Sequence, residues 1–97
     1  MTKDEILNYL RVHKSDFKDR FGVIKIGLFG SFARDEQRED SDIDLVIELE
    51  KDKKNLKTFF DIKRELEEYF GKNVDLGIEQ TLKPIVKEHV KKDIIYV

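Results

Sequence analysis

The apolar residues of this chain switch between a period of about two and a period of about 3.6, the pattern expected where strands alternate with helices. The clearest alternation runs from Asp42 to Glu50, where every second residue is Ile or Leu. Shorter runs of β-branched and apolar residues cover 23–29 and 74–78. Because strands need partners for their backbone hydrogen bonds, these segments are predicted to form one sheet.

Helices are predicted before, between and after these strands. Thr2 opens a capping-box pattern that begins a first helix, which runs to about Asp19. Asn55 is the expected cap of a second helix that ends at Gly71, and Pro84 is well placed to begin a third. The apolar residues of the last two helices are expected to face the core: Leu56, Phe59, Phe60, Ile62, Leu66, Tyr69 and Phe70, then Ile85, Val86, His89 and Val90.

Three shorter segments complete the expected fold. Ser31 is a candidate N-cap for a short helical turn, and the polar stretch 35–41 is expected to be a surface loop. The apolar residues 94–97 suit a short strand or a packed tail.

A chain of 97 residues can bury a single core, so we predict one domain over residues 1–97. Its fold class is α/β (α+β), with a small mixed β-sheet of three to four strands flanked by helices.

The composition argues against several classes of function. The 19 Lys and Arg nearly balance the 21 Asp and Glu, so a net charge of -2 gives no general attraction to nucleic acid, and no nucleic-acid partner is expected. Without cysteine, any metal must bind oxygen or imidazole. No apolar run approaches the roughly 18 residues of a membrane span, and the N-terminal residues lack a signal core. We therefore expect a cytoplasmic protein with no membrane partner.

Three aspartates on two of the predicted strands suggest a metal site. Asp42 and Asp44 are two residues apart in a strand, so their carboxylates leave the same face as close neighbours. Two like charges this close repel, and a divalent cation such as Mg²⁺ or Mn²⁺ would neutralise them. Asp75 would add a third carboxylate if its strand lies beside theirs with the same face outward. Three carboxylates and triphosphate oxygens can hold two metal ions about 4 Å apart, as in phosphoryl-type transfer.

The Gly30-Ser31 turn that follows the strand-type run 23–29 could bind phosphate. Glycine lets a backbone approach a phosphate closely, and the Ser31 hydroxyl can add a hydrogen bond. Taken alone, a Gly-Ser turn is more often structural, and an Asp-x-Asp pair in an acid-rich chain is usually solvated. The order of the turn, the aspartate pair and Asp75 along one chain favours a catalytic site over a chance surface cluster.

Two stretches carry a family resemblance. Leu28-Phe29-Gly30-Ser31-Phe32-Ala33-Arg34 and Asp40-Ser41-Asp42-Ile43-Asp44-Leu45-Val46 resemble the core motif of the DNA polymerase beta-like nucleotidyltransferase superfamily. The short length resembles its minimal nucleotidyltransferases, the MNT or MntA-like antitoxins. The resemblance implies the polymerase beta-like nucleotidyltransferase fold.

The resemblance also implies roles for individual residues. Gly30, Ser31 and Arg34 match nucleotide-binding positions, Asp42 and Asp44 match the metal-binding pair, and Asp75 matches the third metal-binding and catalytic carboxylate, a candidate general base. In one departure, Asp35 stands where the family commonly has glycine, at a position where positive φ suits Asp less well than Gly.

The function implied by the resemblance is Mg²⁺-dependent transfer of AMP from ATP to a hydroxyl of a partner protein. Members of this group pair with a HEPN-domain toxin and modify one of its tyrosines, so the chain would be the antitoxin of a toxin–antitoxin pair. Two Mg²⁺ ions are expected, with Mn²⁺ as an alternative. Two other interpretations stay open: a non-catalytic antitoxin that inhibits its partner stoichiometrically, and a nucleotidyltransferase acting on a small molecule or RNA.

Overall fold

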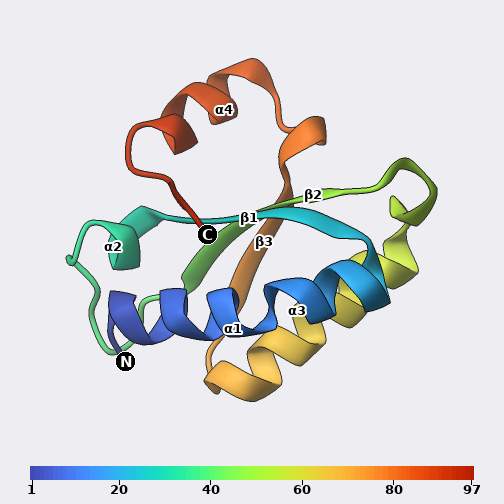
Figure 1. Cartoon of the computed structure of the whole chain (residues 1–97). Coiled ribbons are helices and arrows are strands. Elements are labelled where there is room, and N and C mark those ends of the chain that lie inside the picture. Colours follow the sequence, from blue (N-terminus) through green and yellow to red (C-terminus); the bar gives the residue numbers. More distant parts are fainter.

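The computed structural model describes residues 1–97 and places a four-stranded sheet between helices (Figure 1). The elements in chain order are α1 (Lys3–Phe21), β1 (Val23–Phe29), α2 (Gly30–Ala33), β2 (Ile43–Leu49), α3 (Leu56–Phe70), β3 (Val74–Ile78), α4 (Pro84–Lys91) and β4 (Ile95–Tyr96). Short 3-10 turns, η1 (Lys51–Lys53) and η2 (Glu79–Thr81), follow β2 and β3. This mixed sheet with flanking helices confirms the predicted fold class. None of the helices has the length and apolar character needed to cross a membrane.

The sheet has the strand order β3-β2-β1-β4. β1 pairs antiparallel with both β2 and β4, whereas β2 and β3 run parallel and are connected through α3. Parallel neighbours need such a crossover because a tight turn cannot reverse the chain twice. Since β1 ends where β2 begins, the turn after Phe29 lies beside the first residues of β2.

The helix ends follow the local sequence signals. The Thr2 hydroxyl accepts a hydrogen bond from the Glu5 backbone N–H at 3.2 Å, and the Asn55 side chain accepts from that of Thr58 at 2.9 Å. Both caps were predicted, and each satisfies a backbone donor that the first helical turn leaves free. The predicted cap at Ser31 is wrong: α2 begins one residue earlier at Gly30, and no side chain caps it.

The main core lies between one face of the sheet and the helices α1 and α3 (Figure 1). It contains alternate residues of the strands, including Leu28, Ile43, Leu45 and Ile47, all essentially inaccessible to solvent. The period-two pattern of β2 was therefore a correct guide to the buried face. The opposite face presents the intervening residues, which on β2 are Asp44, Val46 and Glu48, and α4 lies over it (Figure 1).

Part of the predicted core is exposed. On α3 the buried residues Ile62, Leu66 and Phe70 are spaced four apart, which gives one narrow line along the helix. Because α3 packs at the β3 edge of the sheet, the flanks of its apolar stripe extend past the covered surface. The stripe residues left outside are Leu56, Phe60 and Tyr69.

The predicted inward set of α4 is wrong for a related reason. Val90 is buried, but Ile85 is 79% exposed, and Val86 and His89 are also exposed. The sheet face beneath α4 consists largely of polar residues and glycine, so it offers apolar contact to one line of the helix only. A helix of eight residues has two turns with which to make that contact.

Candidate active site

The end of β1 and the start of β2 bring Gly30 against Asp44. Phe29 pairs with Asp44 across the antiparallel ladder, and Gly30 follows with φ 78°, in the left-handed region. A Cβ built on Gly30 would overlap the Asp44 carboxylate. The site therefore requires glycine at this position twice over, for its backbone angle and for the space that a side chain would fill.

The register of β2 and β3 brings the predicted carboxylates together. Asp44 pairs directly with Asp75 in the parallel ladder, so the two side chains leave the same face of the sheet on adjacent strands. Asp42 lies two residues before Asp44, next to the start of β2, and its charge acts on Asp44. All three lie at the end of the sheet that also carries Gly30.

The electrostatics of Asp44 reflect this arrangement. Burial, followed by the neighbouring charges of Asp75 and Asp42, raises the pKa of Asp44 from 3.8 to about 6. Arg34 acts in the opposite direction. A carboxylate with an elevated pKa among like charges is a group that a bound cation would stabilise.

The side chains do not form a closed metal shell by themselves. No group of three or more His, Cys, Asp or Glu side chains is arranged to hold an ion. The donor chemistry nevertheless suits Mg²⁺, because all three predicted ligands supply oxygen and the most buried of them, Asp44, lies among like charges. Asp42, Asp44 and Asp75 are the residues that would hold the metal, with oxygens of the nucleotide completing its coordination.

Arg34 is anchored by two carboxylates. Its Nε donates to Glu36 Oε1 and its Nη1 to Asp93 Oδ2, each at 2.5 Å, and both contacts raise the pKa of Arg34. The second oxygen of Asp93 accepts from the Gly30 backbone N–H at 3.4 Å. Sequence reasoning missed Asp93 because it belongs to no motif and lies 59 positions from Arg34.

Asp35 adopts the left-handed conformation anticipated for its position. Its φ is 57°, and it is the only residue other than glycine with positive φ. Its carboxylate lies 3.0 Å from Lys3 Nζ on α1. This ion pair ties the loop after α2 to the first helix and offsets the negative charge that Asp35 adds near the site.

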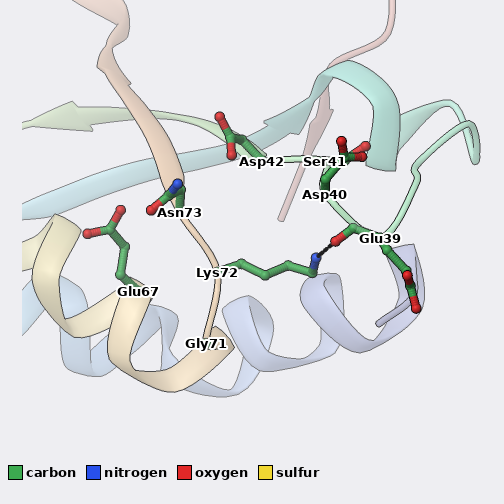
Figure 2. A pocket seen from close by; sticks show the side chains of 8 residues that line it. All are labelled: Glu39, Asp40, Ser41, Asp42, Glu67, Gly71, Lys72 and Asn73. Atoms are coloured by element: carbon green, nitrogen blue, oxygen red, sulfur yellow. Dashed lines mark hydrogen bonds between the residues drawn. The ribbon is translucent and has the colours of Figure 1, made fainter.

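A polar hollow of about 470 Å³ adjoins Asp42 (Figure 2). It lies between the loop before β2 and the turn from α3 to β3, and no apolar side chain lines it. Lys72 reaches across it and donates to the Glu39 backbone carbonyl at 2.6 Å (Figure 2). A polar acceptor group can therefore approach the carboxylates from this side without burying apolar surface.

The comparisons with known proteins agree with this geometry. Residues 10–97 match the family described as nucleotidyltransferase domain. The chain belongs to the nucleotidyltransferase family. A relative from Thermococcus cleftensis, protein adenylyltransferase MntA, is 38% identical over 97 residues, covering 100% of this chain and 97% of its own. A second relative, from Methanocaldococcus jannaschii, is 41% identical and covers 99% and 98% of the two chains.

Two solved structures share this fold over nearly the whole chain. A structure assigned as a minimal nucleotidyltransferase matches with a TM-score of 0.80 and 35% identity, covering 98% of this chain and 95% of its own. A toxin–antitoxin structure with AMP-PNP matches with a TM-score of 0.72 at 20% identity, covering 99% and 72%. The second match shows a shared fold, and the first extends the family assignment to a chain of nearly the same length.

Proposed function

We propose that this nucleotidyltransferase is a Mg²⁺-dependent protein adenylyltransferase that transfers AMP from ATP to a hydroxyl of a partner protein. The observation that carries the proposal is the pairing of Asp44 with Asp75 in the sheet, beside the Gly30 turn. This arrangement puts two strand-borne carboxylates beside a turn at which glycine contributes no side chain of its own.

The proposed reaction is a single in-line displacement. The acceptor oxygen attacks the α-phosphorus and forms a new P–O bond, while the bond from that phosphorus to the bridging oxygen breaks and pyrophosphate leaves. Asp75, exposed at the site, takes the proton of the acceptor hydroxyl. Mg²⁺ would supply charge neutralisation for the entering and leaving oxygens.

The remaining residues bind and orient the nucleotide. Asp42 and Asp44 would hold the metal, and the Gly30 and Ser31 backbone and hydroxyl donors would meet the phosphate oxygens. Arg34 would add a fixed positive charge beside them. A domain of this size has little surface with which to enclose an acceptor, which favours an acceptor presented by another molecule.

We take the partner to be a HEPN-domain toxin and the acceptor to be one of its tyrosines, as the family resemblance implies. Two findings support a toxin partner. The Thermococcus relative is named MntA, and solved MntA–HpeT toxin–antitoxin structures share this fold with a TM-score of 0.71 in one case. That complex carries Asp-to-Glu replacements at two aspartates spaced two apart, the spacing of Asp42 and Asp44.

The test is transfer of label from ATP to the proposed toxin partner. ATP labelled on the α-phosphate, with Mg²⁺, is expected to label the toxin, whereas ATP labelled on the γ-phosphate is expected to leave it unlabelled. Asp42→Asn with Asp44→Asn should abolish labelling and neutralisation of the toxin together. If this double variant still neutralises the toxin in full, stoichiometric inhibition replaces the catalytic proposal.

A further inference from the structure

Asp93 reaches the Gly30-Ser31 turn from the far end of the sequence. It lies between α4 and β4, and its two carboxylate oxygens accept from the Gly30 backbone N–H at 3.4 Å and from Arg34 Nη1 at 2.5 Å. The Asp93 side chain is 17% exposed, whereas that of Arg34 is 46% exposed. A mostly buried carboxylate thus anchors an arginine that is itself nearly half exposed.

The anchors leave one side of the Arg34 guanidinium free. Nε is bound to Glu36 and Nη1 to Asp93, while Nη2 makes no hydrogen bond within the chain. The guanidinium is planar, so two contacts at neighbouring nitrogens fix its plane. Arg34 directly follows α2, which packs against β2, the strand that carries Asp44.

We propose that Asp93 is a positioning residue for nucleotide binding, holding the Arg34 guanidinium and the Gly30 turn where they meet the triphosphate. The proposal rests on the proposed function, since it assumes that a triphosphate binds at this turn. An arginine on a flexible stem loses rotamer freedom when it binds a ligand, and an arginine fixed in advance does not. Asp93 therefore strengthens nucleotide binding through Arg34 and makes no contact with the nucleotide itself.

The same contacts would also allow Asp93 to compete with the triphosphate, and the experiment distinguishes competition from positioning. If the triphosphate needed the Gly30 N–H and the bound Nη1 of Arg34, Asp93 would compete with it, and removing Asp93 would tighten binding. The free Nη2 and the long 3.4 Å contact at Gly30 favour positioning, because neither donor is fully used by Asp93.

The experiment measures the dissociation constant of ATP with Mg²⁺ by equilibrium binding. Asp93→Ala is expected to weaken binding about tenfold, as loss of a charge-assisted contact to a binding residue does. Asp93→Asn should weaken it less, because its amide oxygen can still accept one hydrogen bond. In an Arg34→Ala background, Asp93→Ala should raise the dissociation constant of ATP by less than about threefold. The effects of two residues are not additive when one acts through the other.

Asp16→Ala is the matched control. Asp16 forms an equally short 2.5 Å ion pair with Arg20 on α1, with no contact to the site, so its loss should leave ATP binding unchanged. With the toxin as acceptor, Asp93→Ala should raise the KM for ATP and leave kcat within about twofold, as expected when uniform binding is lost.

Two results would overturn the proposal. One is unchanged or tighter ATP binding by Asp93→Ala, and the other is a loss of ATP binding in the Arg34→Ala, Asp93→Ala double variant equal to the sum of the two single losses in binding free energy. If Asp93→Ala is unfolded by circular dichroism, the Asp93→Asn comparison decides in the same way. A wild-type chain that fails to bind ATP rejects the proposed function together with this inference. A wild-type chain that binds ATP and labels the toxin, with Asp93→Ala equal to it, rejects this inference alone.

Discussion

Asp44→Asn should stabilise the metal-free chain, because the carboxylate is destabilising where it lies. Its pKa is raised from 3.8 to about 6 by burial and by the charges of Asp75 and Asp42. That difference corresponds to at most about 3 kcal/mol against the charged form, at about 1.4 kcal/mol for each tenfold change. Because the side chain is only partly buried, solvent screening lowers the expected gain to about 1–2 kcal/mol. Asparagine keeps the shape and removes the charge.

The stability gained by Asp44→Asn should increase as the pH rises. Below about pH 3 the Asp44 carboxyl is largely protonated in both the folded and the unfolded chain, so the substitution changes stability little. As the pH rises, the unfolded chain releases this proton first, and the wild-type protein loses stability until the pH passes about 6. The advantage of Asp44→Asn is therefore expected to appear between about pH 3 and 6 and to be complete at about pH 7.5.

Thermal unfolding in EDTA at about pH 3 and about pH 7.5 measures this difference, and Tm should rise by about 5–10 °C at the higher pH only. Asp16→Asn is the control with the opposite sign, since hydrogen bonding to Arg20 lowers the pKa of Asp16. Added ATP and Mg²⁺ should raise the Tm of the wild type and not that of Asp44→Asn. A Tm that falls at about pH 7.5, or rises equally at both pH values, would refute the reasoning.

The other predictions concern the Gly30 turn, the cap of α3, and one buried and one exposed apolar residue of α3. Gly30→Ala should lower stability by about 1–3 kcal/mol and weaken ATP binding, because the new methyl overlaps the Asp44 carboxylate at a positive φ; urea unfolding and equilibrium binding measure the two effects. Asn55→Ala should cost about 1 kcal/mol in urea unfolding, and no loss would show that the cap is not formed. Leu66→Ala should cost about 2–5 kcal/mol, whereas Phe60→Ser should change stability by less than about 0.5 kcal/mol; equal losses would contradict the assigned burial.

The sequence was a good guide wherever neighbouring residues determine the outcome. The alternation from Ile43 to Leu49 predicted the strand and its buried face, because each side chain's direction follows from the one before it. Thr2 and Asn55 predicted helix starts, since a cap and its donor lie three residues apart. Helical period also showed that α4 is amphipathic, but it could not show that the sheet face beneath Ile85 is polar.

The candidate site also contains features that local sequence predicts and features that it does not. Asp42 lies two residues before Asp44, just outside β2, so the effect of its charge on Asp44 was predictable from spacing. The position of Asp75 depends on the register between β2 and β3, which are joined through a helix. The sequence alone does not determine that register, and the structure gives it. The contact of Asp93 with Arg34 spans 59 positions, and no local pattern announces it.

The overlap between a side chain at position 30 and the carboxylate at position 44 has a consequence for engineering this enzyme. The two positions share one volume, so a library that varies position 30 by itself returns chains with a distorted turn whatever residue it samples. Randomising both codons together does not remove this limit, because a smaller residue at 44 would lose the carboxylate proposed to hold the metal and would leave the positive φ at position 30 unchanged. Changes in nucleotide preference are therefore more accessible at positions outside this pair.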